Sequence, residues 1–431
     1  MRSERQVLSG DAVTLARELR ELVPAPESVS DTVAEIIERV RASGDDALRY
    51  YTREFDTRGA TPASLVVPDA ELDTALERLD DDIRAGLELA IANVGRVAEA
   101  QLAVDRTVRF DAPPGVEGAV AGGHEVRVRE VPLARAAVYV PAGRAPYPST
   151  VVMGVVAARV AGVGEIAVCS PPGESGDVDP VLLAAWRLAG ATVGYRMGGA
   201  QAIAALAYGT ESVRPVDVIV GPGNLYVQEA KRQVFGQVSI DGFAGPSDLV
   251  VIADGDDDAV DPGALALDLL AQAEHGAGSI VVLLSGSDRL LDAVQARIDD
   301  APDGAAIVRL IGVGDLHQAF VVAETFAPEH LQLMGAAAEA FAPDVRHAGC
   351  VLIGARSGTA FSDYVAGSTH VLPTNGAARF ASGLSPSHFR RHFSEIRIGA
   401  GASALARAAA PIARAEGFEM HARSMEARAD G

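Results

Sequence analysis

Lysine is nearly absent from this chain of 431 residues. Lys231 is the only lysine, so arginine carries almost all of the positive charge. Cysteine is also scarce: Cys169 and Cys350 are the only two, and each lies in an apolar run that is typical of a buried strand. This pattern favours inert core thiols over a disulfide or a thiolate metal site, so any metal ion would need nitrogen and oxygen ligands.

Long apolar runs and an excess of positive charge are missing too. No uninterrupted apolar run approaches the roughly 20 residues needed to cross a bilayer, and the first residues lack the basic and then apolar order of a signal peptide. The formal net charge of -21 would repel both nucleic acid and an anionic membrane surface. We therefore expect a cytoplasmic globular protein with no nucleic-acid or membrane partner, and the length favours two or more domains.

The chain does contain a regular alternation of two kinds of segment. From about residue 131, short β-rich apolar runs alternate with segments of helix length, which is typical of a parallel α/β fold. A Gly/Pro break at residues 243–246 divides this alternation into two series. We therefore expect an α/β fold with two Rossmann-like, doubly wound parallel-sheet domains. The expected strands are residues 137–140, 165–169, 192–197 and 216–220 in the first series, and 248–253, 279–284, 306–311, 331–334 and 350–353 in the second.

The segments that flank this body are predicted to be helical. Residues 30–41 and 70–100 carry apolar positions at spacings of three and four, and the last 30 to 40 residues are rich in alanine and arginine. The tail ends in a polar motif with Glu416 and His421, which suggests that it reaches another domain or another subunit. The expected domains are a helical N-terminal region at 1–130 that packs on the α/β body, Rossmann-like domains at 131–243 and 244–380, and an extended helical C-terminal tail at 381–431.

Histidine is concentrated at one end of the chain. Eight of the nine histidines fall in the last 160 residues, and four of those eight stand in short polar motifs beside an acid or an amide. Imidazole, carboxylate and amide oxygen serve both a zinc ion and a proton-transfer relay, so these motifs point to a site. They are Gln272 to His275, Glu329 with His330, Asp363 with His370, and Glu416 with His421.

The first of these motifs ends a predicted helix. Asp261 is the expected N-cap, Pro262 falls in the first turn, and Gly276 stops the helix. Gln272 and His275 are three residues apart, so they project from one face of the last turn. Taken alone, the motif is more often a polar helix end than a ligand pair.

The next two motifs offer bases and an anionic ligand. Glu329 and His330 end a helix and enter a strand, where they could address two sides of one substrate, because a neutral imidazole suits the removal of an alcohol proton. The alternative is a histidine that caps the helix. Asp363 and His370 lie in a predicted loop of small residues that a ligand could approach closely. The alternative there is an aspartate that binds its own loop amides.

Glycines stand between a strand and a helix at two places in the first series. Residues 197–203 and 220–226 have this arrangement, and such turns are where phosphates and dinucleotides meet helix N-termini. Neither is a Gly-x-Gly-x-x-Gly motif, so tight strand-to-helix turns would explain them equally well.

Together these stretches resemble the histidinol dehydrogenase family, whose members oxidise L-histidinol to L-histidine in two NAD-dependent steps. The matches run in order from about residue 135 to residue 421, and the first 130 residues add little. The matching segments are Tyr139 to Arg144, Gly198 to Glu211, Gly221 to Asn224, Glu229 to Gln233, Ala244 to Ser247, Gln272 to His275, Ala327 to Leu331, Asp363 to Tyr364, His370 to Pro373, and Glu416 to Gly417.

The resemblance implies a role for each matching residue. His330 would be the base that takes the alcohol proton, and Glu329 would activate water against the intermediate aldehyde. The implied ligands of one Zn²⁺ ion per subunit are Gln272, His275, Asp363 and His421. The implied histidinol pocket consists of Ser247, Gln272, His275, Glu329, His330, Asp363, His370, Glu416 and His421, and the implied NAD⁺ contacts are Tyr139, Gln201 and Asn224.

The family forms homodimers in which the C-terminal tail crosses to the partner. By resemblance, Glu416 and His421 would therefore serve the active site of the other chain. Three departures from the family pattern remove no implied ligand or base: Ala142 replaces a common glycine, Asn375 lies in a segment that is more usually Thr-Gly-Gly-Thr, and Glu419 adds an acid to the tail motif. The alternative function is a zinc-dependent hydrolase of an amino-acid-like substrate, in which Glu329 would activate metal-bound water. Such a hydrolase would not need the glycine turns.

Overall fold

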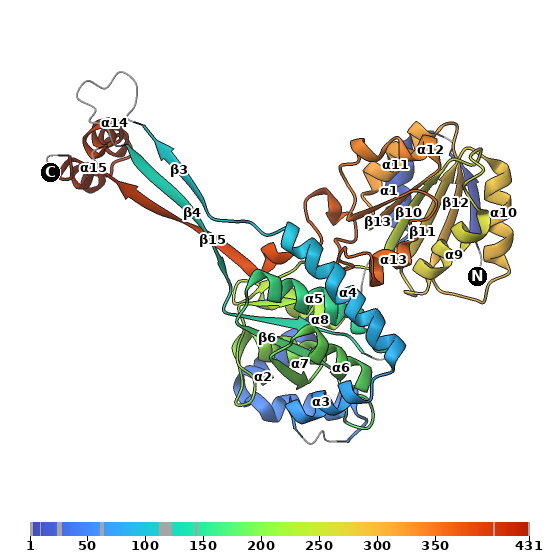
Figure 1. The fold of residues 1–431 in the computed structure, drawn as a ribbon, viewed down its shortest axis with the longest axis horizontal. Coiled ribbons are helices and arrows are strands. Elements are labelled where there is room, and N and C mark those ends of the chain that lie inside the picture. The colour runs from blue at the N-terminus through green and yellow to red at the C-terminus, as the bar shows by residue number, and fades with distance from the viewer. Residues whose placement is uncertain are drawn as a thin grey trace. The chain divides into compact units, whose positions relative to one another are not determined.

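The computed structural model describes residues 3–8, 10–23, 28–60, 64–111, 123–142, 145–399 and 401–429. Over these residues the fold is α/β, with two six-stranded sheets and one three-stranded sheet (Figure 1). The chain divides into two compact units. Both six-stranded sheets belong to the first unit, which consists of residues 1–101 and 133–389, and the three-stranded sheet belongs to the second, which consists of residues 102–132 and 390–431.

The first six-stranded sheet is doubly wound. The chain runs outward from β5 through β6 and β7, and then returns to the other side of β5 to form β8 and β9. Every neighbouring pair is parallel except β2 with β7. The bounds are β2 (Val66–Val67), β5 (Arg135–Tyr139), β6 (Glu165–Ser170), β7 (Val193–Arg196), β8 (Val218–Val220) and β9 (Ser239–Ile240). The switch of direction lies between β5 and β8, where open α/β sheets usually bind ligands at their carboxyl edge.

Helices cover both faces of this sheet. Along β5, Val138 packs with one helical layer and Tyr139 with the other, because successive side chains of a strand point to opposite faces. One layer consists of α3 (Asp69–Glu77), α4 (Asp81–Ala100), α5 (Pro148–Ala161) and α6 (Pro180–Ala189); the other consists of α2 (Ser30–Tyr51), α7 (Gly199–Tyr208) and α8 (Leu225–Val234). A π-helical turn, η1 (Thr52–Asp56), follows α2.

The second six-stranded sheet has the same winding and is parallel throughout. Its central strand β10 is followed outward by β11 and β12, and the chain then returns to form β13 and β14. The bounds are β1 (Ser3–Val7), β10 (Asp248–Ala253), β11 (Ile280–Ser285), β12 (Ile307–Gly312), β13 (His330–Met334) and β14 (Cys350–Ile353). Helices α9 (Pro262–Ala273) and α10 (Asp288–Asp299) pack on one face, and α1 (Ala12–Glu21), α11 (Leu316–Phe326) and α12 (Ala336–Glu339) on the other. Short elements follow, namely η2 (Ala342–Asp344), α13 (Thr359–Tyr364), η3 (Ala377–Arg379) and η4 (Pro386–Phe389).

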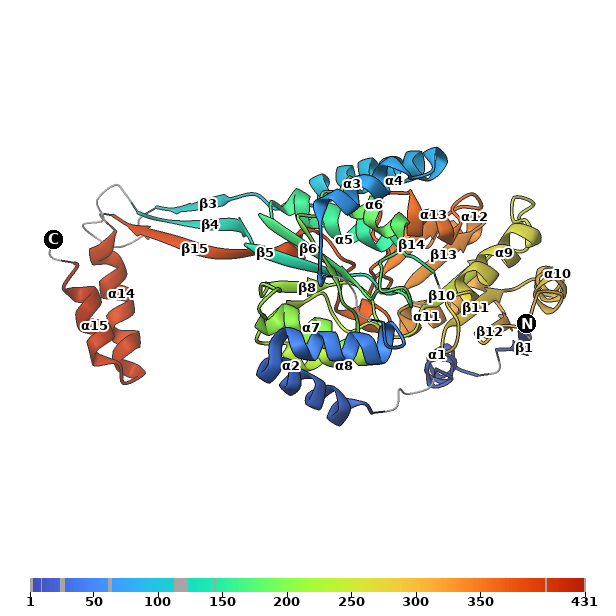
Figure 2. The same ribbon diagram turned by 90° about the horizontal axis from the view of Figure 1, so that it is seen from below.

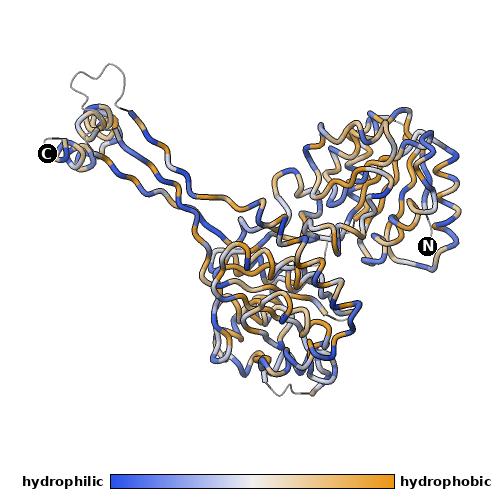
Figure 3. Tube along the Cα trace, viewed as in Figure 1, coloured by the Kyte–Doolittle hydropathy of each residue, from blue (hydrophilic) through white to orange (hydrophobic). Residues whose placement is uncertain are grey.

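The second unit is an antiparallel sheet that leads into two helices. Strand β4 (His124–Pro132) lies between β3 (Arg106–Phe110) and β15 (Arg390–Ile398), and α14 (Ala402–Ala415) packs against α15 (Glu419–Glu426) (Figures 1 and 2). Hydropathy differs between the sheets. Figure 3 shows largely hydrophobic central strands in the two parallel sheets and mixed colouring along β3, β4 and β15, as expected for strands that are not buried on both faces.

The sequence-based expectations for the α/β body are confirmed. Both doubly wound sheets are present, all nine expected strands occur with small shifts at their ends, and Asp261 caps α9 through bonds from the amides of Gly263 and Ala264. No described helix is long and apolar enough to cross a membrane. Gly143 and Arg144, part of the first matching segment, lie outside the described residues, as do Met1 and Arg2.

The expectations for the flanking segments need correction. Residues 1–130 are not only helical, because they also supply β1, β2, β3 and β4, and β1 pairs with β12 of the second sheet. The predicted helix at 70–100 is two helices, α3 and α4, because Asp80 caps the second. The tail is helical only after residue 401, since β15 precedes α14. Asp363 lies in the short helix α13, whereas a loop was expected.

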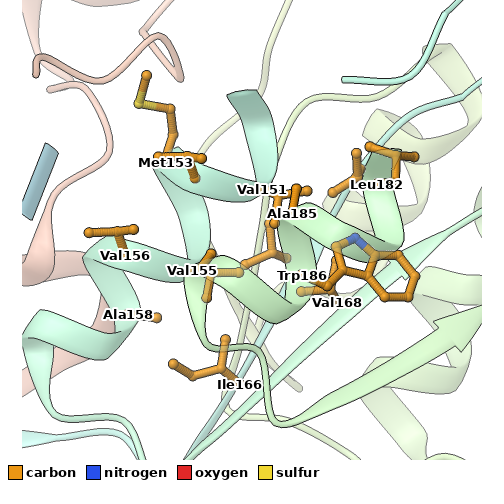
Figure 4. Packing of buried hydrophobic residues seen from close by; sticks show 14 of the residues in the cluster. Val151, Met153, Val155, Val156, Ala158, Ile166, Val168, Leu182, Ala185 and Trp186 are labelled. Carbon is orange, nitrogen blue, oxygen red and sulfur yellow. The ribbon is translucent and has the colours of Figure 1, made fainter. Parts of the chain in front are cut away.

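The hydrophobic core between the first sheet and the layer of α3, α4, α5 and α6 is densely packed around Trp186, the only tryptophan of the chain. This fully buried residue of α6 lies among Val151, Val155, Val168 and Leu182 (Figure 4). Gly194 of β7 faces its ring, and a Cβ added there would lie 2.5 Å from Cζ3 of Trp186.

Gly194→Ala should therefore lower the free energy of unfolding by about 1–3 kcal/mol, because overpacking displaces a rigid ring. The control is Gly86→Ala, at an exposed position of α4 with no atom within 4 Å of the added Cβ. It should leave stability unchanged or raise it by up to about 1 kcal/mol through helix propensity. Urea unfolding followed by Trp186 fluorescence measures both. Equal midpoints for the two variants would contradict the tight packing.

Candidate active site

The polar motifs of the second series meet at the amino edge of the second sheet. Asp248 begins β10 and His330 begins β13, and these two neighbouring strands run parallel with Leu249 opposite His330. Gln272 lies in the last turn of α9, the helix that leads back to β11. Parallel pairing therefore brings Ser247, Gln272 and Glu329 together although they are far apart in sequence.

Glu329 is buried and firmly held. Its Oε2 accepts hydrogen bonds from the Ser247 hydroxyl and from the amide of Asp248 at 3.1 Å. Its own amide donates to Oδ1 of Asp248 at 2.6 Å. Burial raises the pKa of Glu329 to about 7, although nearby His330 and these hydrogen bonds act in the opposite direction. The carboxyl group is thus a base of near-neutral strength.

His330 is a buried imidazole with no hydrogen-bond partner among the described residues. It is 2% exposed, its Nε2 lies 3.6 Å from Oδ1 of Asp363, and its Nδ1 lies 3.7 Å from Oε2 of Glu329. Burial alone lowers the pKa of His330, but the carboxylates of Asp363, Glu329 and Asp248 outweigh it, and the pKa is raised. Buried polar groups are normally satisfied, so an imidazole in this state is suited to bind a group that enters from outside.

Gln272 and His275 each make one hydrogen bond to a neighbour and have one further atom that could bind a metal ion. The Gln272 side chain is buried and donates through Nε2 to the Ser247 hydroxyl, which turns its amide oxygen away from that bond. The Nδ1 atom of His275 lies 3.1 Å from the carbonyl oxygen of Gln272. If Nδ1 carries the proton and donates to that carbonyl, then Nε2 holds the lone pair, which is the arrangement common among metal-ligating histidines.

His370 has both ring nitrogens engaged. Nδ1 lies 2.9 Å from the carbonyl oxygen of Asp363, and Nε2 lies 3.2 Å from the hydroxyl of Thr150 in α5. Burial lowers the pKa of His370, so the neutral ring is favoured. In this structure His370 therefore holds the backbone of Asp363 and links it to the first sheet's helical layer.

The residues fit a zinc ion by their chemistry. An amide oxygen, an imidazole nitrogen and a carboxylate, offered by Gln272, His275 and Asp363, are hard and borderline donors that Zn²⁺ accepts. Within the described ranges no group of three or more His, Cys, Asp or Glu side chains lies close enough to hold a metal ion. His421 and Glu416 belong to the second unit, where both are exposed: His421 lies in α15, and Glu416 ends α14.

The glycine turns of the first sheet lie at its carboxyl edge. Gly221 follows β8 with φ +115, and a Cβ there would lie 2.1 Å from the carbonyl oxygen of Tyr139, so only glycine fits. The Tyr139 hydroxyl accepts a hydrogen bond from the amide of Gly199 at 3.1 Å. Gln201, in the first turn of α7, is buried, and its Nε2 has no partner among the described residues. Asn224 caps α8 by accepting from the amide of Val227 at 3.1 Å.

A buried ion pair holds the second of these turns. The only lysine, Lys231, is 1% exposed and donates to the carbonyl oxygen of Gly221 at 3.0 Å and to Asp241. Asp241 in turn accepts from the amide of Gly221 at 2.7 Å. The pair therefore binds both polar groups of one glycine, which fixes the turn next to the switch point.

Sequence reasoning missed the charged residues that support the site. In the sequence, Asp248 is only the first residue of a predicted apolar strand. Nothing in the sequence marks Arg20 or Asp241 as part of a site. Their partners lie far along the chain: Arg20 binds Asp248 across 228 positions. Lys231 is distinguished in the sequence by the scarcity of lysine and by its place in the matching segment Glu229 to Gln233.

Two doubly wound sheets, one with glycine turns at its carboxyl edge and the other with a buried carboxyl–imidazole pair at its amino edge, define an α/β enzyme. The histidinol dehydrogenase family profile matches residues 23–429. The chain belongs to the histidinol dehydrogenase family and is an oxidoreductase of histidine biosynthesis.

Individual relatives agree with this assignment. A histidinol dehydrogenase of Pseudomonas fluorescens is 43% identical over 415 residues, which cover 93% of this chain and 91% of the relative. One from Parasynechococcus marenigrum is 41% identical over 437 residues, which cover 99% of this chain and 96% of the relative. The crystal structure of histidinol dehydrogenase from Elizabethkingia anophelis superposes with a TM-score of 0.89 at 29% identity, and covers 99% of this chain and 98% of that chain.

Proposed function

We propose that the chain oxidises L-histidinol through L-histidinal to L-histidine in two NAD-dependent steps at the amino edge of the second sheet. One observation carries the proposal: His330 is buried between the carboxylates of Glu329 and Asp363, with both ring nitrogens free of hydrogen bonds among the described residues. A base that waits for a substrate proton needs this arrangement.

His330 would act as the base in both oxidations, and Glu329 would act between them. His330 accepts the proton of the alcohol as the carbon loses hydride. Glu329 removes a proton from the water that adds to the aldehyde, and its pKa of about 7 suits that transfer. After His330 has released the first proton to solvent, it accepts a proton from the hydrate as the second hydride leaves. Ser247, Asp363 and His370 would line the same pocket.

Four side chains would hold the metal ion. Gln272, His275 and Asp363 supply three ligands from one chain, and His421 supplies the fourth. When bound, zinc would orient the amine and imidazole of histidinol, and NAD⁺ would accept the hydride. Tyr139, Gln201 and Asn224 would contact NAD⁺ at the glycine turns of the first sheet, where backbone amides at the starts of α7 and α8 suit a pyrophosphate.

The active site would be shared between two copies of the chain. Glu416 and His421 lie in the second unit, which is a small sheet with two helices and has exposed apolar side chains, among them Ile396, Phe418 and Met420. A homodimer that exchanges this unit would bring Glu416 and His421 to the partner's pocket and cover apolar surface.

The purified protein should form two molecules of NADH for each histidinol consumed. Activity should disappear after treatment with a chelator and return when Zn²⁺ is added, because the metal orients the substrate. Absorbance of reduced nicotinamide measures both effects. A zinc hydrolase, the alternative, would give no NADH and would instead cleave an amide or peptide substrate.

The two bases should be separable by mutation. His330→Asn should slow histidinol oxidation by about 10²- to 10⁴-fold, because no other base replaces it. Glu329→Gln should spare that step and stall the next, so that NADH per histidinol falls from two toward one. Rates measured separately with histidinol and with histidinal test the division. Equal losses of both rates in the Gln variant would refute it.

Heterodimers test the sharing of sites. A His421→Ala chain mixed with a His330→Asn chain should recover part of the activity, because one of the two sites in the mixed dimer would contain both intact residues. Each variant alone should remain inactive and serves as the control. Differently tagged chains, purified in sequence, verify that heterodimers formed. Absence of recovery in verified heterodimers would count against exchange of the tail.

A further inference from the structure

Arg20 of α1 reaches the amino edge of the second sheet. Its Nη1 donates to Oδ2 of Asp248 at 2.7 Å, and its Nη2 donates to the carbonyl oxygen of Phe326 at 2.6 Å. Its Cζ also lies 3.6 Å from the centroid of the Phe326 ring. One guanidinium thus binds the first residue of β10 and the last residue of α11, two elements that meet at Glu329.

Asp248 connects Arg20 to Glu329 through hydrogen bonds. One carboxylate oxygen accepts from Arg20, and the other accepts from the amide of Glu329 at 2.6 Å, while the amide of Asp248 donates to Oε2 of Glu329 at 3.1 Å. Asp248 is 1% exposed. A carboxylate this deeply buried needs a cation, and Arg20 is its ion-pair partner.

Phe326 makes the second contact with Arg20. The residue after it, Ala327, has φ 53 and ψ 67, a left-handed conformation that is unfavourable for alanine, and Pro328 then leads into Glu329. A backbone in this state persists only where its surroundings hold it. The hydrogen bond and ring contact of Arg20 hold Phe326, so they fix the entry to the turn that delivers Glu329.

We propose that Arg20 is a positioning residue, which sets the carboxyl group of Glu329 for the water-activation step through Asp248 and through the Phe326 carbonyl. The inference rests on the proposed role of Glu329 and extends it to a residue 309 positions away in the chain. His330 depends less on Arg20, because the register of β13 with β10 and β14 holds its backbone.

Replacement of Arg20 should therefore affect the two oxidations unequally. Arg20→Met should lower kcat with histidinal by about 10- to 100-fold, while KM for histidinal and the rate with histidinol change by less than about threefold. NADH per histidinol should fall below two. The matched control is Arg17→Met, an exposed arginine of the same helix, whose rates should stay within about twofold of the unaltered chain. Equal losses in both steps, or an unchanged kcat with histidinal, would overturn the inference.

A conservative variant covers the case in which Arg20→Met does not fold. Arg20→Lys keeps a positive charge beside Asp248. However, a single ammonium group cannot donate to both Asp248 and the Phe326 carbonyl as the two nitrogens of the guanidinium do. Its kcat with histidinal should fall by about threefold to tenfold and its circular dichroism spectrum should not change. Full histidinal activity in this variant would equally overturn the inference.

Glu329→Gln, measured in the same series, separates this inference from the proposed function. If Glu329→Gln oxidises histidinal normally, the assigned role of Glu329 fails. If Glu329→Gln stalls with histidinal and Arg20→Met does not, only the role of Arg20 fails.

Discussion

The parallel pairing of β10 with β13 is the constraint on which the candidate site depends. With Leu249 opposite His330, the residues just before each strand, Ser247 and Glu329, come within hydrogen-bond reach, and α9 delivers Gln272 to the same hydroxyl. A shift of one residue in that register would turn His330 to the opposite face of the sheet. Because the second sheet is buried on both faces by helices, the apolar side chains of β10 resist such a shift. The positions of Glu329 and His330 are thus a consequence of how the core packs.

Burial on both faces also dictates how charge can be placed. A charged group near the centre of such a sheet is removed from water, and it is tolerated only with a partner and well-formed hydrogen bonds. Two such pairs hold turns at the strand ends: Lys231 with Asp241 in the first sheet, and Arg20 with Asp248 in the second. Both pairs bind backbone groups as well as each other, at Gly221 in one case and at Glu329 and Phe326 in the other. These pairs hold the turns of the candidate site, whereas an apolar replacement would fill the volume without binding the backbone.

The sequence predicted the elements whose pattern is local and missed those whose partners are distant. Strand β10 is a run of apolar residues ended by acids, and α9 carries its own cap and stop, so both were located closely. Strand β1, Ser-Glu-Arg-Gln-Val, is polar and becomes a strand only through pairing with β12. Strand β4 does alternate Val126 and Val128 with arginines, which is a local strand pattern inside a region that is predicted to be helical. The grouping of Gln272 and Glu329 around Ser247 was reachable only through the family resemblance, since more than fifty positions separate the two in the chain. The support from Arg20 was not reachable at all, because a lone arginine in an amphipathic helix looks like any surface residue.

The direction of the helix dipoles accounts for the proposed use of opposite edges in the two similar sheets. At the carboxyl edge of the first sheet the chain enters helices, so the N-termini of α7 and α8 present partial positive charge beside Tyr139 and Gly221. Such an edge favours the anionic phosphates of a dinucleotide.

At the amino edge of the second sheet the chain leaves helices, so α9 and α11 end there and present carbonyl oxygens and partial negative charge. That edge favours cations: the guanidinium of Arg20 already binds the last carbonyl of α11, and His275 at the end of α9 is placed where a divalent cation would gain from the same field. The same fold, repeated in two sheets, would therefore provide the proposed sites for an anionic cofactor at one edge and for a metal ion at the opposite edge, without any change in topology.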